Sequence, residues 1–121
     1  MKWFLDVNDR PFNALKSGKK KIETRTFVTV YESPDYRQMK NGDILTFENN
    51  QTKERITMEI LGVRHYKDVS IMFDAEGQEN CMSYDAPREE AIDSYNQLKG
   101  YTEGIKKNGI YAIEVRPVKN E

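Results

Sequence analysis

Apolar and polar residues alternate along several stretches of the chain, a pattern that is typical of half-buried strands. Five stretches predict strands, over residues 2–7, 20–30, 44–48, 55–66 and 109–116. In the fourth stretch the alternation slips by one position beside Gly62, because the apolar residues that follow Ile60 are Leu61 and Val63. Such a slip predicts a β-bulge, which allows a long strand to bend in a small barrel.

Helix-start and helix-stop signals predict two short helices. The first follows Asn8, carries Pro11 in its first turn and ends at Gly18, which enters the left-handed conformation at little cost. The second begins near Pro87 and ends before Gly100, and a short helix over residues 68–75 is a third candidate. Strands and inserted helices in one chain of 121 residues indicate an α+β fold, with a small, mostly antiparallel barrel of five to six strands in a single domain over residues 1–121.

The composition excludes several classes of protein. The chain has 19 basic and 20 acidic residues, so its net charge of −1 argues against indiscriminate coating of nucleic acid. With one cysteine and one histidine, the chain cannot form a disulfide framework or a Cys- or His-rich metal site. We therefore expect neither metal nor cofactor. The chain has no apolar run of membrane-spanning length, and its start turns charged too early for a signal peptide, so we expect a cytoplasmic protein with no membrane partner.

The charges are distributed unevenly along the chain. Residues 16–25 hold five basic residues and one acidic residue, a local charge of +4, whereas residues 74–90 carry −5. If Ile22 faces the core, the alternation of the predicted strand places Glu23 and Arg25 together on the opposite face, with Lys20 nearby. These three side chains either line a cleft or form a solvated ion pair that contributes little to stability.

The same segment resembles a known family. Gly18, Lys20, Glu23 and Arg25 match the G-x-K-x-x-E-x-R signature of the ASCH domain, and the order of the flanking strands and of the Asn-Gly-Asp turn at residues 41–43 is similar too. The resemblance covers nearly the whole chain. It implies a PUA-like β-barrel whose cleft is floored by the signature residues and binds RNA, a nucleotide or a modified nucleoside.

The resemblance also implies an alternative, a small hydrolase. One branch of the family resembles an amidohydrolase that acts on N-acetylated cytidine through a lysine, a threonine and a glutamate, and another branch is associated with ribonuclease activity. Lys20 matches the lysine and Glu79 the glutamate, with Glu76 as a competitor, but Glu23 stands where that branch has threonine. Thr24 is one position away and should point to the other face. A hydrolase would therefore rely on Lys20 and Glu23.

Further residues are candidates for ligand contacts. The guanidinium of Arg25 can donate paired hydrogen bonds to a phosphate or a base edge. Lys19 and Lys21 either steer a nucleic-acid backbone or are plain solvated residues, and Tyr31 and Tyr36 are candidates for stacking on a base. Trp3 shares the face of core residues, and we assign it to packing. His65 is either a packing or surface residue or a general base for RNA cleavage, and Cys81 receives no role. A protein partner on the acidic helix, through an exposed apolar stripe over residues 86–99, is a third hypothesis.

Overall fold

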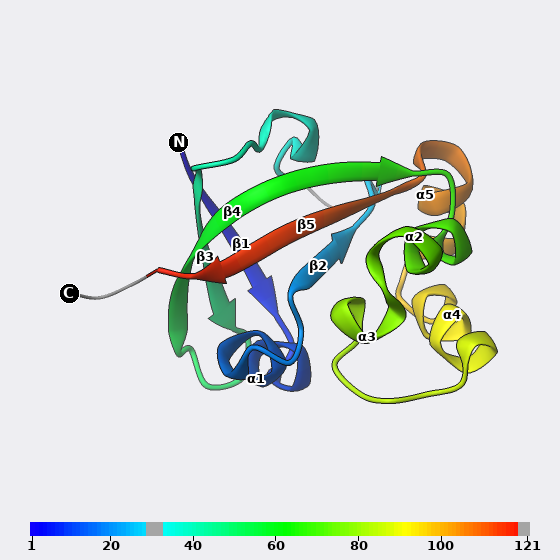
Figure 1. Ribbon diagram of the computed structural model, residues 1–121, viewed down its shortest axis with the longest axis horizontal. Coiled ribbons are helices and arrows are strands. Elements are labelled where there is room, and N and C mark those ends of the chain that lie inside the picture. Colours follow the sequence, from blue (N-terminus) through cyan, green and yellow to red (C-terminus); the bar gives the residue numbers. More distant parts are fainter. Residues whose placement is uncertain (29–32, 119–121) are drawn as a thin grey trace.

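The computed structural model describes residues 1–28 and 33–118 (Figure 1). Its five strands form one sheet in the order β1–β3–β4–β5–β2. The bounds are Lys2–Val7 for β1, Ile22–Arg25 for β2, Ile44–Asn49 for β3, Arg55–Tyr66 for β4 and Ile110–Pro117 for β5. The strands expected over residues 2–7 and 55–66 are confirmed at their predicted bounds.

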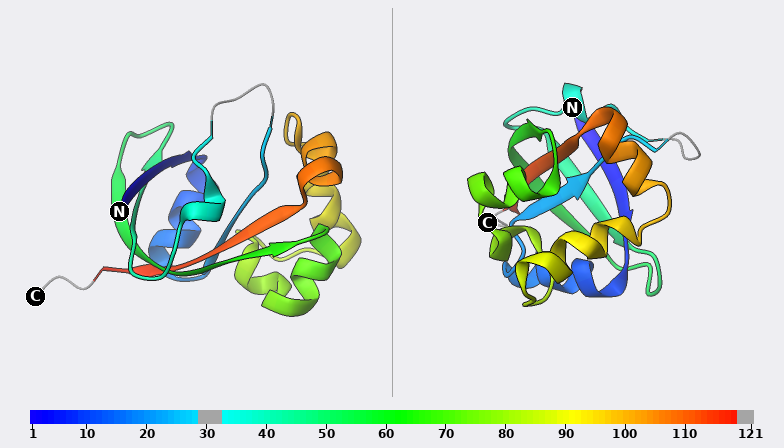
Figure 2. Two further views of the ribbon diagram at one scale, coloured as in Figure 1. Left: turned by 90° about the horizontal axis from the view of Figure 1, so that it is seen from above. Right: turned by 90° about the vertical axis from the view of Figure 1, so that its right-hand side faces the viewer.

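Helices cover the sheet at two places. The helix α1 (Asp9–Ser17) follows β1, and a 3-10 turn (Tyr36–Gln38) precedes β3. The other helices all lie between β4 and β5 in the sequence and gather at the end where these two strands meet (Figure 2). They are α2 (Val69–Glu76), α3 (Gln78–Cys81), α4 (Arg88–Asn96) and α5 (Tyr101–Asn108). None of the helices in the described part of the chain is long and apolar enough to cross a membrane.

The sheet curves into an incomplete barrel, because its two end strands, β1 and β2, do not pair with each other. The strand β1 runs parallel to β3, and the remaining neighbours are antiparallel. One hydrogen bond crosses the gap: Arg25 Nη2 on β2 donates to the carbonyl oxygen of Asp6 on β1 at 2.8 Å. The two end strands therefore border an open seam.

The predicted bulge is present in β4. The pairing of β4 with β5 shifts by one residue between Ile60 and Gly62, where the apolar alternation slips. Before the bulge, β4 also pairs with β3 in a regular antiparallel register from Glu59 back to Arg55. The bulge therefore bends β4 between the barrel and the helical end of the sheet.

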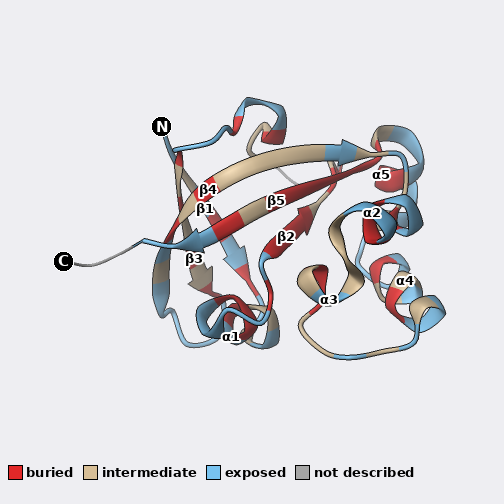
Figure 3. Cartoon of the chain, in the orientation of Figure 1, coloured by how far each residue is buried: buried red, intermediate tan, exposed pale blue. Residues whose placement is uncertain are grey.

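The core has two parts (Figure 3). One lies inside the curved sheet, where Leu45 and Phe47 of β3 pack with Phe12 and Leu15 of α1. The other lies between the sheet and α2 to α5, and includes Ile22 of β2. Because Ile22 packs in this second cluster, the neighbouring Glu23 and Arg25 point to the opposite face of β2, as the alternation predicts.

Several elements differ from the predictions, and the bounds of β3, β5 and α2 are each shifted by one residue. The strand expected over residues 20–30 ends at Arg25, because the side chain of Thr26 bonds to the carbonyl of Gly109 and the main chain leaves the ladder; residues 29–30 lie outside the described residues. The short helix α3 and the helix α5 were not predicted. Gly100 does not end α4; it precedes α5 in a left-handed conformation.

Candidate functional site

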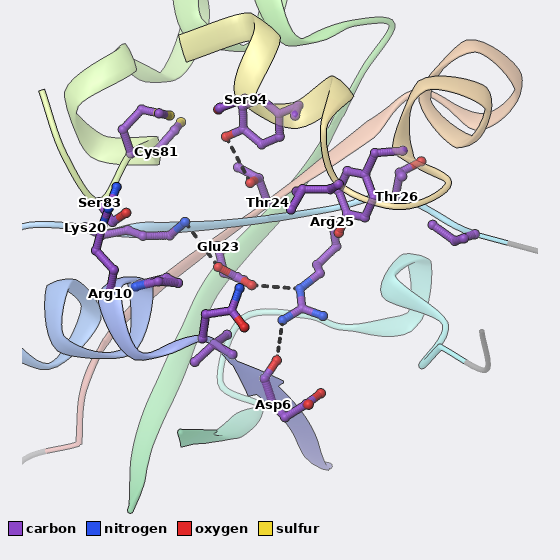
Figure 4. Close-up of a pocket in the computed structure, with 18 of the residues that line it drawn as sticks. Asp6, Arg10, Lys20, Glu23, Thr24, Arg25, Thr26, Cys81, Ser83 and Ser94 are labelled. Atoms are coloured by element: carbon purple, nitrogen blue, oxygen red, sulfur yellow. Dashed lines mark hydrogen bonds and ion pairs between the residues drawn. The ribbon is translucent and has the colours of Figure 1, made fainter. Parts of the chain in front are cut away.

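A pocket of about 820 Å³ opens along the seam between β1 and β2. The start of α1, the segment Met82–Tyr84 and the connection from α4 to α5 complete its walls. The three signature residues Lys20, Glu23 and Arg25 all line this pocket, as the cleft hypothesis expects (Figure 4).

The signature residues form a nearly buried ion cluster, which we call the pocket cluster. Glu23 lies between two cations: its Oε1 is 3.2 Å from Lys20 Nζ, and its Oε2 accepts a hydrogen bond of 2.7 Å from Arg25 Nε. Side-chain exposure is 8% for Lys20, 6% for Glu23 and 18% for Arg25. The solvated ion pair, which was the alternative reading, therefore does not describe these residues.

The charges within the pocket cluster shift the pKa values of Glu23 and Arg25. Burial alone would raise the pKa of Glu23, but the charges and hydrogen bonds of Lys20 and Arg25 outweigh it and hold that pKa below its ordinary value. Burial opposes the charge on Arg25, and the Glu23 carboxylate overcomes that effect and raises the pKa of Arg25. Glu23 is therefore a carboxylate near neutral pH, and the cluster carries one net positive charge.

On the helical side, Thr24, Tyr95 and Cys81 contribute neutral groups to the wall, and Lys99 contributes a cation. Thr24 points away from Glu23 and donates its hydroxyl to the Tyr95 hydroxyl of α4 at 3.0 Å (Figure 4). Cys81 also lines the pocket, and burial raises the pKa of its thiol to about 12. The thiol therefore stays protonated near neutral pH and is a poor nucleophile, which agrees with the absence of a predicted role.

Sequence reasoning missed two residues at the rim of the pocket. The guanidinium of Arg10, in the first turn of α1, lies 4.7 Å from the centre of the Tyr84 ring, in a cation–π contact. Arg10 is exposed, and no ion pair joins it to an acidic residue among residues 1–28 and 33–118. The sequence offered a weak signal only, because a basic residue between a helix-capping Asn8 and Pro11 is read first as part of the helix start.

Several predicted site residues lie away from this pocket. Lys19 and Lys21 are exposed and do not line it, and Lys19 Nζ pairs with Asp85 at 3.4 Å. Glu79 is also exposed and does not line it. Tyr31 lies outside the described residues. The structure therefore brings Lys20, Glu23 and Arg25 together and leaves Glu79 apart from them.

The remaining aromatic candidates contribute to the core, and the histidine lies at the surface. Tyr36 borders the pocket but is only 2% exposed, and its ring packs against Phe27 and Tyr111, so little of its face is open for stacking. Trp3 packs on the core, as expected, and donates its Nε1 to Asp43. His65 is exposed and lies outside the pocket lining; its ring is 4.7 Å from that of Tyr111, and its Nε2 is 2.7 Å from the Asn108 carbonyl oxygen.

Two of the remaining hypotheses lose support from the contacts. Glu76, the competitor of Glu79, is bonded to Arg64 and to the Tyr66 hydroxyl and does not line the pocket. On α4, Tyr95 is buried and Ile92 packs against the second core cluster. The helix therefore presents no exposed apolar stripe for a protein partner, although Leu98 beyond its end is 43% exposed at the rim of the pocket.

Solved structures of similar proteins share this architecture. The crystal structure of the hypothetical protein PH0355 superimposes with a TM-score of 0.80 at 33% identity, covering 98% of this chain and 100% of that one. The solution structure of protein PF0455 from Pyrococcus furiosus gives a TM-score of 0.73 at 29% identity, with 99% and 100% covered. A tyrosine-to-phenylalanine variant of ZmASCH from Zymomonas mobilis gives 0.61 at 17% identity, with 98% and 76% covered, and this likeness concerns the fold alone.

The family comparison agrees with the signature. No curated protein matches the sequence significantly. The model of the ASCH domain matches residues 5–119, which include every residue of the pocket cluster. The fold is the PUA-like fold of that family, which is associated in general with RNA binding. The chain belongs to the ASCH domain family.

Proposed function

We propose that this protein binds RNA, or a nucleotide or modified nucleoside, in the pocket along the seam. The observation that carries the proposal is the convergence of Lys20, Glu23 and Arg25 on one pocket, with Arg10 at its rim. The pocket cluster keeps a net positive charge, and Arg10 adds a second, solvent-accessible one. A few cations around a pocket suit one short anionic ligand better than a long duplex.

The orientation of Arg25 and the contact between Arg10 and Tyr84 support the same proposal. Glu23 occupies one hydrogen-bonding side of Arg25, and the Asp6 carbonyl holds its Nη2, so the guanidinium is fixed in one orientation. A fixed guanidinium is suited to a phosphate or to stacking on a base. At the rim, Arg10 and Tyr84 already form a cation and an aromatic ring in contact, the two group types that single-stranded nucleic acids favour.

Binding is favoured over hydrolysis by the contacts of Glu23. Each of its two carboxylate oxygens is engaged by a cation, which lowers its basicity towards a water molecule. Thr24 bonds to Tyr95 on the other face of β2 and so does not stand beside Lys20 as a nucleophile. We extend the proposal to a single domain that works in the cytoplasm.

Titration of labelled single-stranded RNA by fluorescence anisotropy tests the function. We expect Arg10→Ala and Arg25→Gln each to weaken binding by at least about threefold, because each removes a positive charge from the pocket. Lys67→Ala is the matched control, since Lys67 is an exposed cation outside the pocket and its loss changes the net charge equally. Equal affinities for the wild type and both pocket variants would contradict the proposal.

A further inference from the structure

The pocket runs along the edge of a strand rather than over one of its faces. Thr24 and Glu23 point to opposite faces of β2, yet both line the pocket, as do Lys20 and Arg25 (Figure 4). Side chains of both faces border one cavity when that cavity lies beside the strand. Because β2 ends the sheet, the main-chain groups on its outer edge face this cavity.

The register identifies which residue offers its main chain. Residues of an antiparallel strand direct their N–H and C=O groups alternately to one edge and the other. The carbonyl of Lys21 accepts from the Val115 N–H at 3.0 Å, so this carbonyl and the main chains of Glu23 and Arg25 face β5, whereas the Lys21 N–H donates to the Asn80 carbonyl before the ladder begins. Thr24 therefore directs its N–H and C=O away from β5, into the pocket.

In the described part of the chain, the main chain of Thr24 has no hydrogen-bond partner on that edge. Within residues 1–28 and 33–118, no hydrogen bond outside the pairing of β2 with β5 engages it, although Thr24 is only 6% exposed. On the same edge, the main chain of Thr26 bonds to the Tyr101 hydroxyl, and Ile22 does not line the pocket. A donor and an acceptor at a buried position with no protein partner indicate a ligand contact.

We propose that the main-chain N–H and C=O of Thr24 bind the Watson–Crick edge of one unpaired nucleobase, which enters the seam edge-on. This inference rests on the proposed function and adds which protein groups recognise the base of the ligand. Every nucleobase carries a donor and an acceptor side by side on that edge, so it complements the paired groups of Thr24. The base then lies between the Thr24–Tyr95 wall and the guanidinium of Arg25, which offers a surface for stacking.

An added peptide strand fits this edge less well. Strand addition needs a row of free main-chain groups on alternate residues, whereas Thr26 is engaged and Ile22 does not line the pocket. The bond from Arg25 to the Asp6 carbonyl also crosses the seam. One planar group satisfies Thr24 alone, and the cations of the pocket favour a nucleotide.

Chemically matched RNAs test the inference. Short oligouridylates are compared in which every base is unmodified, methylated at N3, or methylated at C5. Methylation at N3 blocks the Watson–Crick edge, and we expect it to weaken binding by about tenfold or more, while the same methyl group at C5 changes affinity by less than about twofold. Oligoadenylates with 1-deaza- or 7-deaza-adenine repeat the comparison for a purine, where only the 1-deaza change should weaken binding.

Variants of Thr24 test the protein side. Thr24→Pro removes an N–H that points away from the ladder, a position at which an edge strand tolerates proline, and it also removes the hydroxyl bonded to Tyr95. We expect it to weaken binding of unmodified RNA by about tenfold and to erase the difference between the N3- and C5-methylated RNAs. Thr24→Val keeps the N–H while losing the bond to Tyr95, and it should keep the difference. If Thr24→Pro fails to fold by circular dichroism, the modified RNAs decide alone.

The outcomes separate the inference from the proposed function. If RNAs with N3- and C5-methylated bases bind equally well, the main chain of Thr24 does not recognise the base, and RNA binding itself still stands. Failure of every RNA to bind overturns the proposed function and the inference together. Tight binding of an extended peptide that displaces RNA from the pocket also overturns the inference.

Discussion

Two ion clusters of this protein have opposite charge patterns and different surroundings. In the pocket cluster, one carboxylate lies between two cations, and all three side chains are at most 18% exposed. In the second, which we call the outer cluster, Arg64 lies between the carboxylates of Glu76 and Glu114, and the guanidinium-bearing side chain is 40% exposed. The pocket cluster lines the pocket, whereas no member of the outer cluster does.

The difference shows that charge clustering alone does not mark a functional site. The outer cluster joins the end of α2 to β4 and β5, and the Tyr66 hydroxyl adds a bond to Glu76, so its role is to hold a helix on the sheet. The pocket cluster joins no helix to the sheet; it shapes the wall of a cavity. The predictions below separate these two roles.

The largest expected effect comes from Glu23→Gln. It leaves Lys20 and Arg25 nearly buried without a carboxylate, and breaking a buried ion pair in this way costs about 3–5 kcal/mol in the free energy of unfolding. Urea denaturation measures the loss. Glu79→Gln is the control, since Glu79 is exposed, and it should change stability by less than about 0.5 kcal/mol. Similar stability of the two variants would contradict the burial of the cluster.

Acid should destabilise the protein through the same carboxylate. The pKa of Glu23 lies below its ordinary value of 4.5 in the folded protein, so the unfolded chain takes up a proton first as the pH falls. The stability due to Glu23 is therefore complete above about pH 4.5 and is lost as the pH falls through the folded pKa. Urea denaturation at a series of pH values should show a flatter acid dependence for Glu23→Gln than for the wild type; identical profiles would speak against this assignment.

Breaking the outer cluster should have a smaller effect on stability and none on the ligand. In Glu76→Gln, Arg64 keeps Glu114 and access to solvent, so we expect a loss of about 1–2 kcal/mol. Thermal denaturation and RNA titration of the same sample test both parts. A fall in RNA affinity at unchanged fold would mean that the outer cluster does act on the pocket.

The smallest effect concerns salt. If about three cations contact the phosphates of a single strand, the logarithm of the association constant should fall with the logarithm of salt concentration with a slope of about −2. Arg10→Ala should reduce the magnitude of that slope by about 0.7, whereas Lys67→Ala should leave it unchanged. A much steeper slope for the wild type would indicate that RNA spreads over the surface beyond the pocket.

The local part of the fold and the centre of the site were predictable from the sequence. Alternation placed Ile22 in the core and Glu23 with Arg25 on the other face, and the slip beside Gly62 located the bulge. These features depend on neighbouring residues only. The G-x-K-x-x-E-x-R signature then identified the family, which the family model confirms over residues 5–119.

The rest depends on contacts between distant parts of the chain. Nothing local in the sequence shows that Arg10 lies over Tyr84, or that β1 and β2 end the sheet and leave a seam. Glu79 was a candidate because the resemblance matched it to a catalytic glutamate, yet its position within α3 depends on how that helix packs. The helix α5 escaped prediction because Gly104, packed against the Phe27 carbonyl, reads as a helix breaker.

The pairing of β4 with β5 has a consequence for how this fold can diversify. Tyr66 at the end of β4 and Ile110 at the start of β5 are register partners, so the whole segment between them leaves and returns at one point of the sheet. This excursion supplies Tyr84, Tyr95 and Tyr101 to the pocket, while the pocket cluster stays on the barrel. The length and the pocket-facing residues of this segment can therefore change, and with them the choice of ligand, as long as the apolar contacts that hold Ile22 of β2 are kept.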